Sequence, residues 1–599
     1  MKAVRMLSNQ VLLAGSTSVP GSVGSYHISR LRAIFWLMAI VIGFLQAWHY
    51  RNTIDNDTIS HLDMGDAYFR GDWGMAISGY WNPLYAWLLG LAMLVVQPSS
   101  YWEYPAVHFV LFIIFLFAFC CFEFFLRELI RFHNSVQKIN SSGEQDSNVP
   151  QRTWIVLGYS LFLWSSLTLL SFDETNPDML VAAFVYVASG LLLRIRNGTA
   201  NRITFVLLGL ALGLGYLTKQ VMFPLAFVFL GVGLFSVGNL RRAIPLSLVA
   251  LVTFLAVAAP LIIALYAAKG RLTYGESGRF AYAVLVNGVA YRHWQGEEPG
   301  SGTPVHPTRK IFDNPATFEF GDPIGGTYPL WYDITYWYEG IKTHFDFVQQ
   351  ANVLWKNLED MQRHLFGLNG SLLTGFLVLL FVSSRGWLII KDISEYWFLI
   401  IPALSALCLY SLVLVVDRYV APFLTVLILS MFFGMRLRES HDKGRVVTGV
   451  TMAILFMLVT RLIPEVSSSV PDLLNWRDTK SHPYWEVADE LRKMGVRPGD
   501  KVVSVSYANV HNVKWARLAR VHIIAEVYHS IYEPEKNDFW KAAPSVQKQI
   551  IRAFANTGAR VIVSDEELRG PGTAGWQRIG DTSYFAYFLP GLGTSASAG

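Results

Sequence analysis

Five aspartates gather within eighteen residues, directly after the first hydrophobic run of the chain. They are Asp55, Asp57, Asp63, Asp66 and Asp72, and His61 lies among them. An ionised carboxylate in hydrocarbon is strongly destabilising, so carboxylates beside a membrane are solvated, paired with cations or used in chemistry. In a chain with few charges, this stretch is the first candidate for a functional site.

Asp55 and Asp57 are the pair best placed for chemistry, because they lie two residues apart and just beyond the hydrophobic run. The pair is compatible with a general base, with ligands for Mg²⁺ or Mn²⁺, or with a solvated loop. Either residue could instead cap a helix that begins near Thr58, since Asp is a preferred N-cap. Both Asp57 and Asp55 are therefore candidates for a base, and any metal would be bound by these two.

A second acidic group lies in one short polar turn, SFDETNPD, which carries Asp173, Glu174 and Asp178. Asp178 could cap the helix that follows Pro177, because Pro is favoured at the start of a helix. Asp173 and Glu174 could instead contribute to an acceptor site or bind a divalent cation.

Two cations and one aromatic residue complete the candidates. Lys219 ends an apolar run, where it either reaches the lipid headgroups or binds a phosphate. Arg418 either pairs with the neighbouring Asp417 or makes a bidentate contact with a phosphate. Tyr85 is an interfacial anchor or a contact for sugar or lipid.

The composition identifies the kind of protein that must position these residues. Of 599 residues, 53% are hydrophobic and only 16% are charged, and the mean hydropathy is +0.35. Soluble proteins are nearer one quarter charged, so the chain is predicted to be a polytopic α-helical membrane protein. The net charge of +5 does not indicate nucleic acid, because the basic residues lie in short loops between apolar runs. The three cysteines all lie in such runs and predict neither disulfides nor a metal site.

Apolar runs of membrane-spanning length predict about eleven spans, with basic residues in every loop on the side of the N-terminus. Residues 81–97 are short and aromatic, and counting them as a span would move the basic loop 127–152 to the other side. We therefore interpret 81–97 as an amphipathic helix in the outer interface, with a twelfth span as the alternative. The predicted spans lie near 33–50, 106–126, 153–171, 179–195, 203–218, 221–238, 244–267, 371–390, 396–415, 419–435 and 446–463.

This threading divides the chain into four parts. Residues 1–32 are a cytoplasmic tail, and 33–463 form a transmembrane module with large outer loops at 51–105 and 268–370. Residues 464–590 alternate helical and strand patterns, which predicts a small extracytoplasmic α/β domain, and 591–599 form a disordered tail. The histidines and aspartates of loop 268–370 fit no zinc signature, so this loop is interpreted as a lid or acceptor-binding surface with short helices.

Several short motifs share their order and their side of the membrane with one family. Four short motifs together resemble the GT-C superfamily over roughly residues 33–460. They are the loop motif GDW followed by NPLY, the turn with NPD, the run ending in LTK and the segment DRYVAP. This superfamily comprises glycosyltransferases that use polyprenyl-phosphate sugars, including the protein O-mannosyltransferase and aminoarabinose transferase families.

The resemblance implies a catalytic role for Asp57 and phosphate-binding roles for Lys219 and Arg418. His61 falls where the family often has Tyr, which leaves its role open. The implied function is an inverting transfer of a sugar from a polyprenyl-phosphate donor to a glycan, lipid or protein acceptor, with no nucleic acid involved. Metal dependence, through Mg²⁺ or Mn²⁺, stays open.

Two other functions remain as alternatives: a transporter or flippase of lipid-linked sugars, and a non-catalytic envelope scaffold. A transporter is expected to carry ionisable residues inside its spans and paired broken helices in two halves, whereas here the charges gather on one face. No retention signal for an internal compartment is visible, which favours a bacterial inner membrane with the active site and the C-terminal domain on the periplasmic side.

Overall fold

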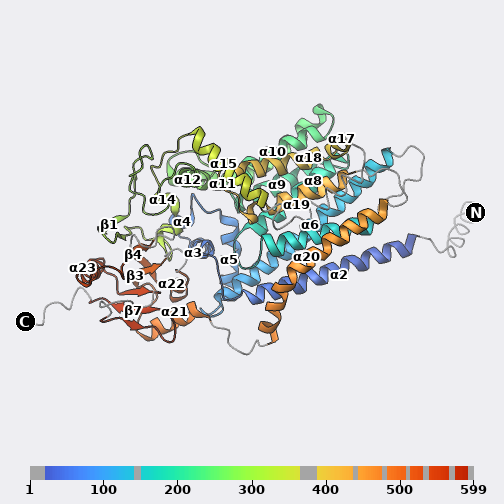
Figure 1. Ribbon diagram of the computed structural model, residues 1–599. Coiled ribbons are helices and arrows are strands. Elements are labelled where there is room, and N and C mark those ends of the chain that lie inside the picture. The colour runs from blue at the N-terminus through green and yellow to red at the C-terminus, as the bar shows by residue number, and fades with distance from the viewer. Residues whose placement is uncertain are drawn as a thin grey trace, which may run out of the picture.

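The computed structural model describes residues 21–140, 150–363, 388–435, 443–474, 482–507, 513–529, 538–565 and 574–590. Its long helices lie side by side, and a sheet-bearing part lies at one end of them, with α3 and α5 between the two (Figure 1). The helical part comprises α2 (Gly21–His49), α6 (Glu103–Asn140), α7 (Gln151–Trp164) with the π-helical turn η1 (Ser165–Leu169), α8 (Asp178–Arg196), α9 (Arg202–Thr218), α10 (Met222–Ser236), α11 (Leu240–Lys269), α17 (Leu388–Ser394), α18 (Trp397–Ser411), α19 (Asp417–Gly434) and α20 (Lys443–Leu474).

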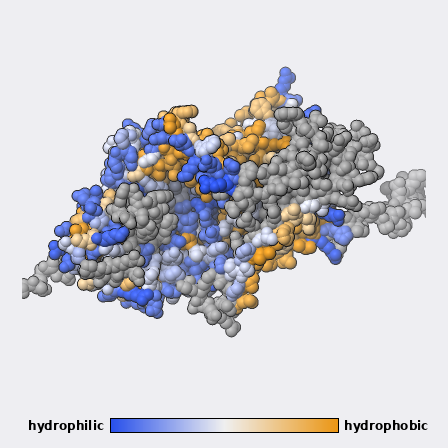
Figure 2. All heavy atoms as spheres, in the orientation of Figure 1, coloured by the Kyte–Doolittle hydropathy of each residue, from blue (hydrophilic) through white to orange (hydrophobic). Residues whose placement is uncertain are grey.

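The helices match the predicted spans in position. Within the described ranges, five helices are long and apolar enough to cross a membrane, namely α2, α6, α8, α11 and α19, while α9, α10 and α18 are shorter apolar helices. The predicted span 371–390 lies almost entirely outside the described residues. Apolar side chains gather on the surface of the helical part, and hydrophilic ones gather over the sheet-bearing end (Figure 2). The polytopic helical class is thus supported, and the number of spans stays a prediction.

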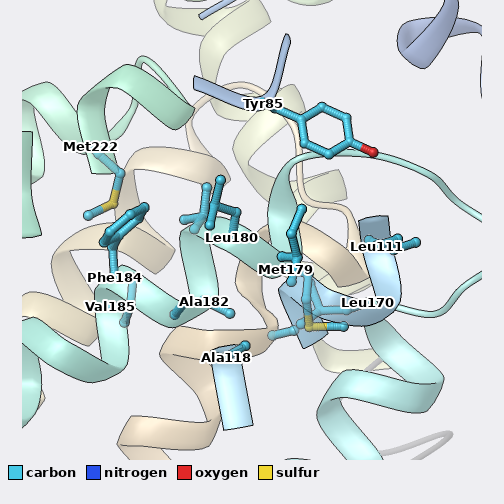
Figure 3. Packing of buried hydrophobic residues seen from close by; sticks show 14 of the residues in the cluster. Tyr85, Leu111, Ala118, Leu170, Met179, Leu180, Ala182, Phe184, Val185 and Met222 are labelled. Atoms are coloured by element: carbon cyan, nitrogen blue, oxygen red, sulfur yellow. The ribbon is translucent and has the colours of Figure 1, made fainter. Parts of the chain in front are cut away.

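Helix α8 is the centre of the helical core. Nearly all of its residues are buried, and it packs against α6, α9, α10 and α19. Its apolar side chains meet those of α6 and α10 in one continuous layer (Figure 3). Between helices in a bilayer, such packing is stabilised by close van der Waals contacts rather than by removal of apolar surface from water. Because α8 is held on all sides, the polar turn in front of its first residue has a fixed place.

The loop after α2 folds into α3 (Asn56–Arg70), α4 (Trp73–Ala76) and α5 (Pro83–Val96). Helix α3 ends at Gly71, whose φ of 75° is a left-handed conformation that favours glycine. Helices α3 and α5 touch through their backbones: a Cβ added at Gly65 would lie 2.7 Å from the Ala86 carbonyl oxygen, and one added at Gly90 would lie 3.0 Å from the Gly65 Cα. This contact fixes α5 against the helix that carries Asp57.

Loop 268–370 contains α12 (Ser277–Leu285), β1 (Arg309–Phe312), β2 (Thr317–Glu319), α13 (Pro329–Tyr332), α14 (Ile334–Trp337) and α15 (Phe347–Gln362). The C-terminal part contains α21 (Pro483–Lys493), β3 (Lys501–Tyr507), α22 (Lys514–Ala519), β4 (His522–His529), α23 (Pro544–Ala555), β5 (Val561–Ser564), β6 (Gln577–Arg578) and β7 (Phe585–Phe588). The predicted short helices of the loop and the predicted α/β pattern of the C-terminal part are both present.

The seven-stranded sheet joins these two parts of the chain in the order β1-β2-β4-β3-β5-β7-β6. Strand β3 pairs in parallel with β4 and β5, which is the arrangement expected for alternating strands and helices. Strand β2 of the outer loop pairs antiparallel with β4, with Phe318 opposite Glu526. The C-terminal sheet is therefore completed by strands from loop 268–370, which the alternating pattern of residues 464–590 did not predict.

Candidate active site

The Arg418 guanidinium lies close to four of the acidic residues that the sequence predicts as site candidates. Arg418 lies in the first turn of α19 and forms an ion pair with Glu174, and its Nε lies 3.3 Å from Asp178 Oδ2. Its other nitrogens lie 3.8 Å from Asp57 Oδ2 and 4.0 Å from Asp55 Oδ2. Carboxylates from two separate segments, the start of α3 and the turn before α8, thus face one cation. We call these residues, together with Lys219, the Arg418 cluster.

Lys219 joins the cluster from the end of α9. Its Nζ lies 2.5 Å from Asp178 Oδ1 and 3.5 Å from the centre of the Tyr419 ring. A cation over an aromatic face is attracted by the ring quadrupole, which adds to the ion pair. The next residue, Gln220, donates to the backbone oxygens of Gly79 and Tyr80 at 2.8 and 3.0 Å. Lys219 therefore has a fixed position beside Arg418.

Thr175 positions the first acidic pair, although the sequence analysis gave it no role. Its hydroxyl accepts from the Asp55 N–H at 3.0 Å and lies 2.8 Å from the Thr58 hydroxyl. Its carbonyl oxygen accepts from the Tyr85 hydroxyl at 2.9 Å. The turn before α8, the start of α3 and the start of α5 are thus tied at one residue. The only sequence signal for this role is that Thr175 lies inside the acidic turn.

Asp57 is the carboxylate with the most unusual environment. Its Oδ1 accepts from the Trp331 indole N–H at 3.0 Å, and Trp331 comes from loop 268–370. The pKa of Asp57 is raised to about 7, first by burial and second by the nearby carboxylate of Asp55. Arg418, Trp331 and Lys219 act in the opposite direction and lower this pKa. A carboxyl group with a pKa near the working pH is suited to accept a proton in catalysis. Sequence analysis missed Trp331, since nothing in its neighbourhood links it to residue 57.

The remaining candidates lie around the cluster. His61 is 1% exposed and packs edge to face against Trp81 and Tyr85, with ring centroids 5.0 and 5.2 Å apart. Burial, and next the charge of Lys219, lower the pKa of His61 to about 3, so this imidazole is neutral. Asp173 lies exposed at the edge of the acidic turn. The structure therefore places His61 and Asp173 beside the cluster, outside the ion pairs of Arg418.

The capping interpretations of these aspartates are corrected by the structure. Helix α3 begins at Asn56 and has Asp55 at the N-cap position, without a side-chain capping bond, and Asp57 lies within its first turn. Helix α8 begins at Asp178 itself, after Pro177, and the Asp178 carboxylate contacts Lys219 and Arg418. Neither helix therefore has a side-chain cap from these aspartates, whose carboxylates face Arg418 and Lys219 instead.

The cluster does not offer a metal site in this arrangement. Among the described residues, no three His, Cys, Asp or Glu side chains are grouped so that they could hold a metal ion. Asp55 and Asp57, the predicted ligands, face the Arg418 guanidinium, which supplies the positive charge that a Mg²⁺ or Mn²⁺ ion would otherwise bring.

Comparison with solved structures identifies the fold. ArnT from Cupriavidus metallidurans in the apo state matches with a TM-score of 0.50 and 12% identity, over 94% of this chain and 98% of that one. ArnT bound to undecaprenyl phosphate matches with a TM-score of 0.47 and 12% identity, over 92% and 97%. The Archaeoglobus fulgidus oligosaccharyltransferase gives 0.44 and 14%, over 90% of this chain and 69% of that one. No protein-family model and no curated protein matches the sequence.

The first of these likenesses covers nearly the whole of both chains, so this protein has the fold of ArnT. The resemblance to the GT-C superfamily that the motifs indicated is confirmed at the level of the fold. The identity of 12% carries no residue roles across. The roles of the Arg418 cluster therefore rest on its own geometry.

Proposed function

We propose that this protein is an inverting glycosyltransferase that moves a sugar from a polyprenyl-phosphate carrier to an acceptor on the outer face of a membrane. The observation that carries the proposal is the 3.8 Å approach of Arg418 to Asp57, whose pKa is raised to about 7. A general base and a phosphate-binding pair are the two groups that such a displacement requires.

In the proposed reaction, an acceptor hydroxyl or amine attacks the anomeric carbon of the sugar. Asp57 takes the acceptor proton as the new bond forms, and the bond between the anomeric carbon and the phosphate oxygen breaks. The electron pair of that bond leaves with the polyprenyl phosphate. A single displacement inverts the configuration at the anomeric carbon.

Arg418 and Lys219 are proposed to stabilise the charge of the departing phosphate. In the structure, Glu174 forms an ion pair with the Arg418 guanidinium, and 42% of the Glu174 side chain is exposed. An exposed carboxylate on a turn can move aside, so we infer that the donor phosphate replaces Glu174 on the guanidinium. Undecaprenyl phosphate, the ligand named for the ArnT structure, belongs to the class of carrier proposed here.

The membrane and its sides belong to the same proposal. Basic residues in the loops on the side of the N-terminus support a cytoplasmic N-terminus. The loops after α2, η1 and α9 and the turn before α19 then lie on the outer side, where a donor phosphate meets the Arg418 cluster. We propose a bacterial inner membrane with this face toward the periplasm.

The proposal is tested by mass spectrometry of envelope lipids, glycans and proteins from cells with and without the gene. A sugar modification that disappears on deletion and returns with the wild-type gene would identify donor sugar and acceptor together. Identical envelopes in the two strains, together with transport of lipid-linked sugar into proteoliposomes that contain the protein, would exclude the transferase in favour of the flippase.

Replacement of Trp331 by Phe is expected to lower sugar transfer at pH 7 by about tenfold. The variant loses one hydrogen bond to a charged group, and such a bond contributes about 1.5 kcal/mol. The indole N–H stabilises the ionised carboxylate, so its removal raises the pKa of Asp57 further above its ordinary value. Because Asp57 acts in its ionised form, the rising limb of the pH–rate profile should move to higher pH. A matched Trp355→Phe variant in α15, whose side chain is 68% exposed, should keep the wild-type profile. An unmoved profile in Trp331→Phe would contradict a role for this contact.

A further inference from the structure

Lys219 of the Arg418 cluster lies in a break between two apolar helices. Helix α9 ends at Thr218, and α10 begins at Met222. The backbone of Lys219 is extended in this break, with φ −154° and ψ 134°. A helix end lacks the continuous backbone hydrogen bonds that fix residues in the middle of a helix. The position of the Lys219 ammonium therefore depends on the contacts that hold the break.

The side chain of the next residue, Gln220, joins the break to two other segments. Its Nε2 donates to the oxygens of Gly79 and Tyr80, in the segment before α5. Its Oε1 accepts from the N–H and from the hydroxyl of Ser277, the first residue of α12, at 2.9 and 2.7 Å. The two donors and two acceptor positions of the amide are thus all used. Because Gln220 is 7% exposed, water competes little for these bonds.

Loop 268–370 lies directly on the Gln220 amide. A Cβ added at Gly275, whose φ is 141°, would overlap the Gln220 side chain. The N–H of the following residue, Glu276, donates to the Gly79 oxygen at 2.8 Å. The loop, the segment before α5 and the Gln220 amide therefore form one set of mutual contacts, with no room for a larger residue at position 275.

The segment that Gln220 contacts also reaches the proposed base. The Tyr80 ring packs edge to face against Phe280 of α12, with centroids 5.6 Å apart, and lies 6.4 Å from the Trp331 ring. Trp331 in turn donates to Asp57 at 3.0 Å. The same loop thus supports Asp57 through Trp331 and the helix break through the Gln220 amide.

We propose that Gln220 is a positioning residue through which loop 268–370 holds Lys219 in place for the donor phosphate. Lys219 is the group that contacts the phosphate and Gln220 acts through it, so this inference rests on the proposed function. A displacement of about 1 Å is enough to weaken a positioned contact strongly. Donor binding therefore depends on Ser277, which acts on Lys219 through Gln220.

The test measures binding of undecaprenyl phosphate to the full-length protein in nanodiscs of a zwitterionic lipid, with the thermal midpoint measured in parallel. Gln220→Met keeps the length of the side chain and removes its hydrogen bonds. Gln547→Met in α23 is the matched control, because Gln547 is 3% exposed and its Nε2 donates to the oxygens of Phe539 and Trp540 at 3.1 and 3.3 Å. Both changes remove a buried amide that binds two consecutive backbone oxygens, so both should lower the midpoint.

Ser277→Ala tests the contact from the side of the loop, because it removes the hydroxyl bond to Gln220 and leaves the N–H bond in place. We expect the Kd for undecaprenyl phosphate to rise about tenfold in Gln220→Met and about threefold in Ser277→Ala, as for the loss of one or more hydrogen bonds. Gln547→Met should bind like the wild type. The double variant of Gln220→Met and Ser277→Ala should bind no more weakly than Gln220→Met, because the second change acts through a side chain that is already gone.

Wild-type affinity in Gln220→Met would overturn the inference, and so would an equal loss of affinity in Gln547→Met or losses that multiply in the double variant. In each of these cases the wild type still binds undecaprenyl phosphate, so the proposed function stands. A wild-type protein that does not bind it would contradict the proposed function itself, and this inference with it. If Gln220→Met does not fold, the comparison of Ser277→Ala with Gln547→Met decides alone. Once the reaction is known, Gln220→Met should raise the KM for the donor more than it lowers kcat.

Discussion

Replacement of Asp57 by Asn should lower sugar transfer by about 10²- to 10⁴-fold, the contribution typical of a positioned general base. The amide keeps the size of the carboxylate and can still accept from the Trp331 indole, but it cannot take a proton. Because the change removes a group whose pKa is raised by burial, the folded state should not be destabilised. The measurement is transfer of the sugar identified by envelope mass spectrometry, with the thermal midpoint measured in parallel.

Two further variants make this result specific. Asp322→Asn changes an exposed aspartate of the outer loop and should retain wild-type activity. Asp55→Asn removes the neighbouring charge that helps to raise the pKa of Asp57, so it should shift the rising limb of the pH–rate profile to lower pH. The wild-type rate should itself rise through about pH 7 as Asp57 ionises. Full activity of Asp57→Asn would exclude the proposed base.

Replacement of Arg418 by Gln should have the second large effect, on both activity and folding. Without the guanidinium, Glu174 and Asp178 lose a counter-ion, and breaking a buried ion pair destabilises by about 3–5 kcal/mol. We expect about 3 kcal/mol, because Glu174 is 42% exposed and can be solvated. The pKa of Asp57 should also rise further, since Arg418 is among the groups that lower it. Sugar transfer at pH 7 should then be lost, because Asp57 would be mostly protonated and could not accept a proton.

Arg418→Lys tests the geometry rather than the charge. A single ammonium cannot face carboxylates on several sides as the planar guanidinium does, so this variant should stay well below wild-type activity. Arg309→Gln, which removes an exposed cation paired with Glu319 in the outer loop, is the matched control and should change neither activity nor the thermal midpoint measurably. Wild-type activity in Arg418→Gln would refute a phosphate-binding role.

The positions of the helices were predictable from the sequence, because a membrane span requires about twenty consecutive, mostly apolar residues. It also predicted which segments meet at the site. Five residues flank the ends of apolar runs that the predicted threading places on the same side: Asp57, Glu174, Asp178, Lys219 and Arg418. Residues at the same ends of packed helices must come together, so this part of the site follows from topology alone.

The remaining parts of the site depend on contacts that no local pattern encodes. Trp331 reaches Asp57 across 274 positions of the chain, and Arg517 reaches Asp63 across 454. The short helix that carries Arg517 was not predicted, since six residues are too few to show a helical period. Strand β2 has only three residues, and its pairing with β4 is determined by the folded loop and not by its own sequence.

The pairing of β2 with β4 has a consequence for the biosynthesis of the protein. Backbone hydrogen bonds join the loop that carries Trp331 to β4. The Phe320 N–H donates to the Ile524 oxygen at 2.8 Å, and the Ile523 N–H donates to the Thr327 oxygen at 3.0 Å. During synthesis this loop emerges before α18, α19 and α20, but its partner strand emerges only after them. Helices α18, α19 and α20 are therefore synthesised before β4 can hold the loop that carries Trp331, and the Trp331–Asp57 contact gains this support only after the last strands have been made.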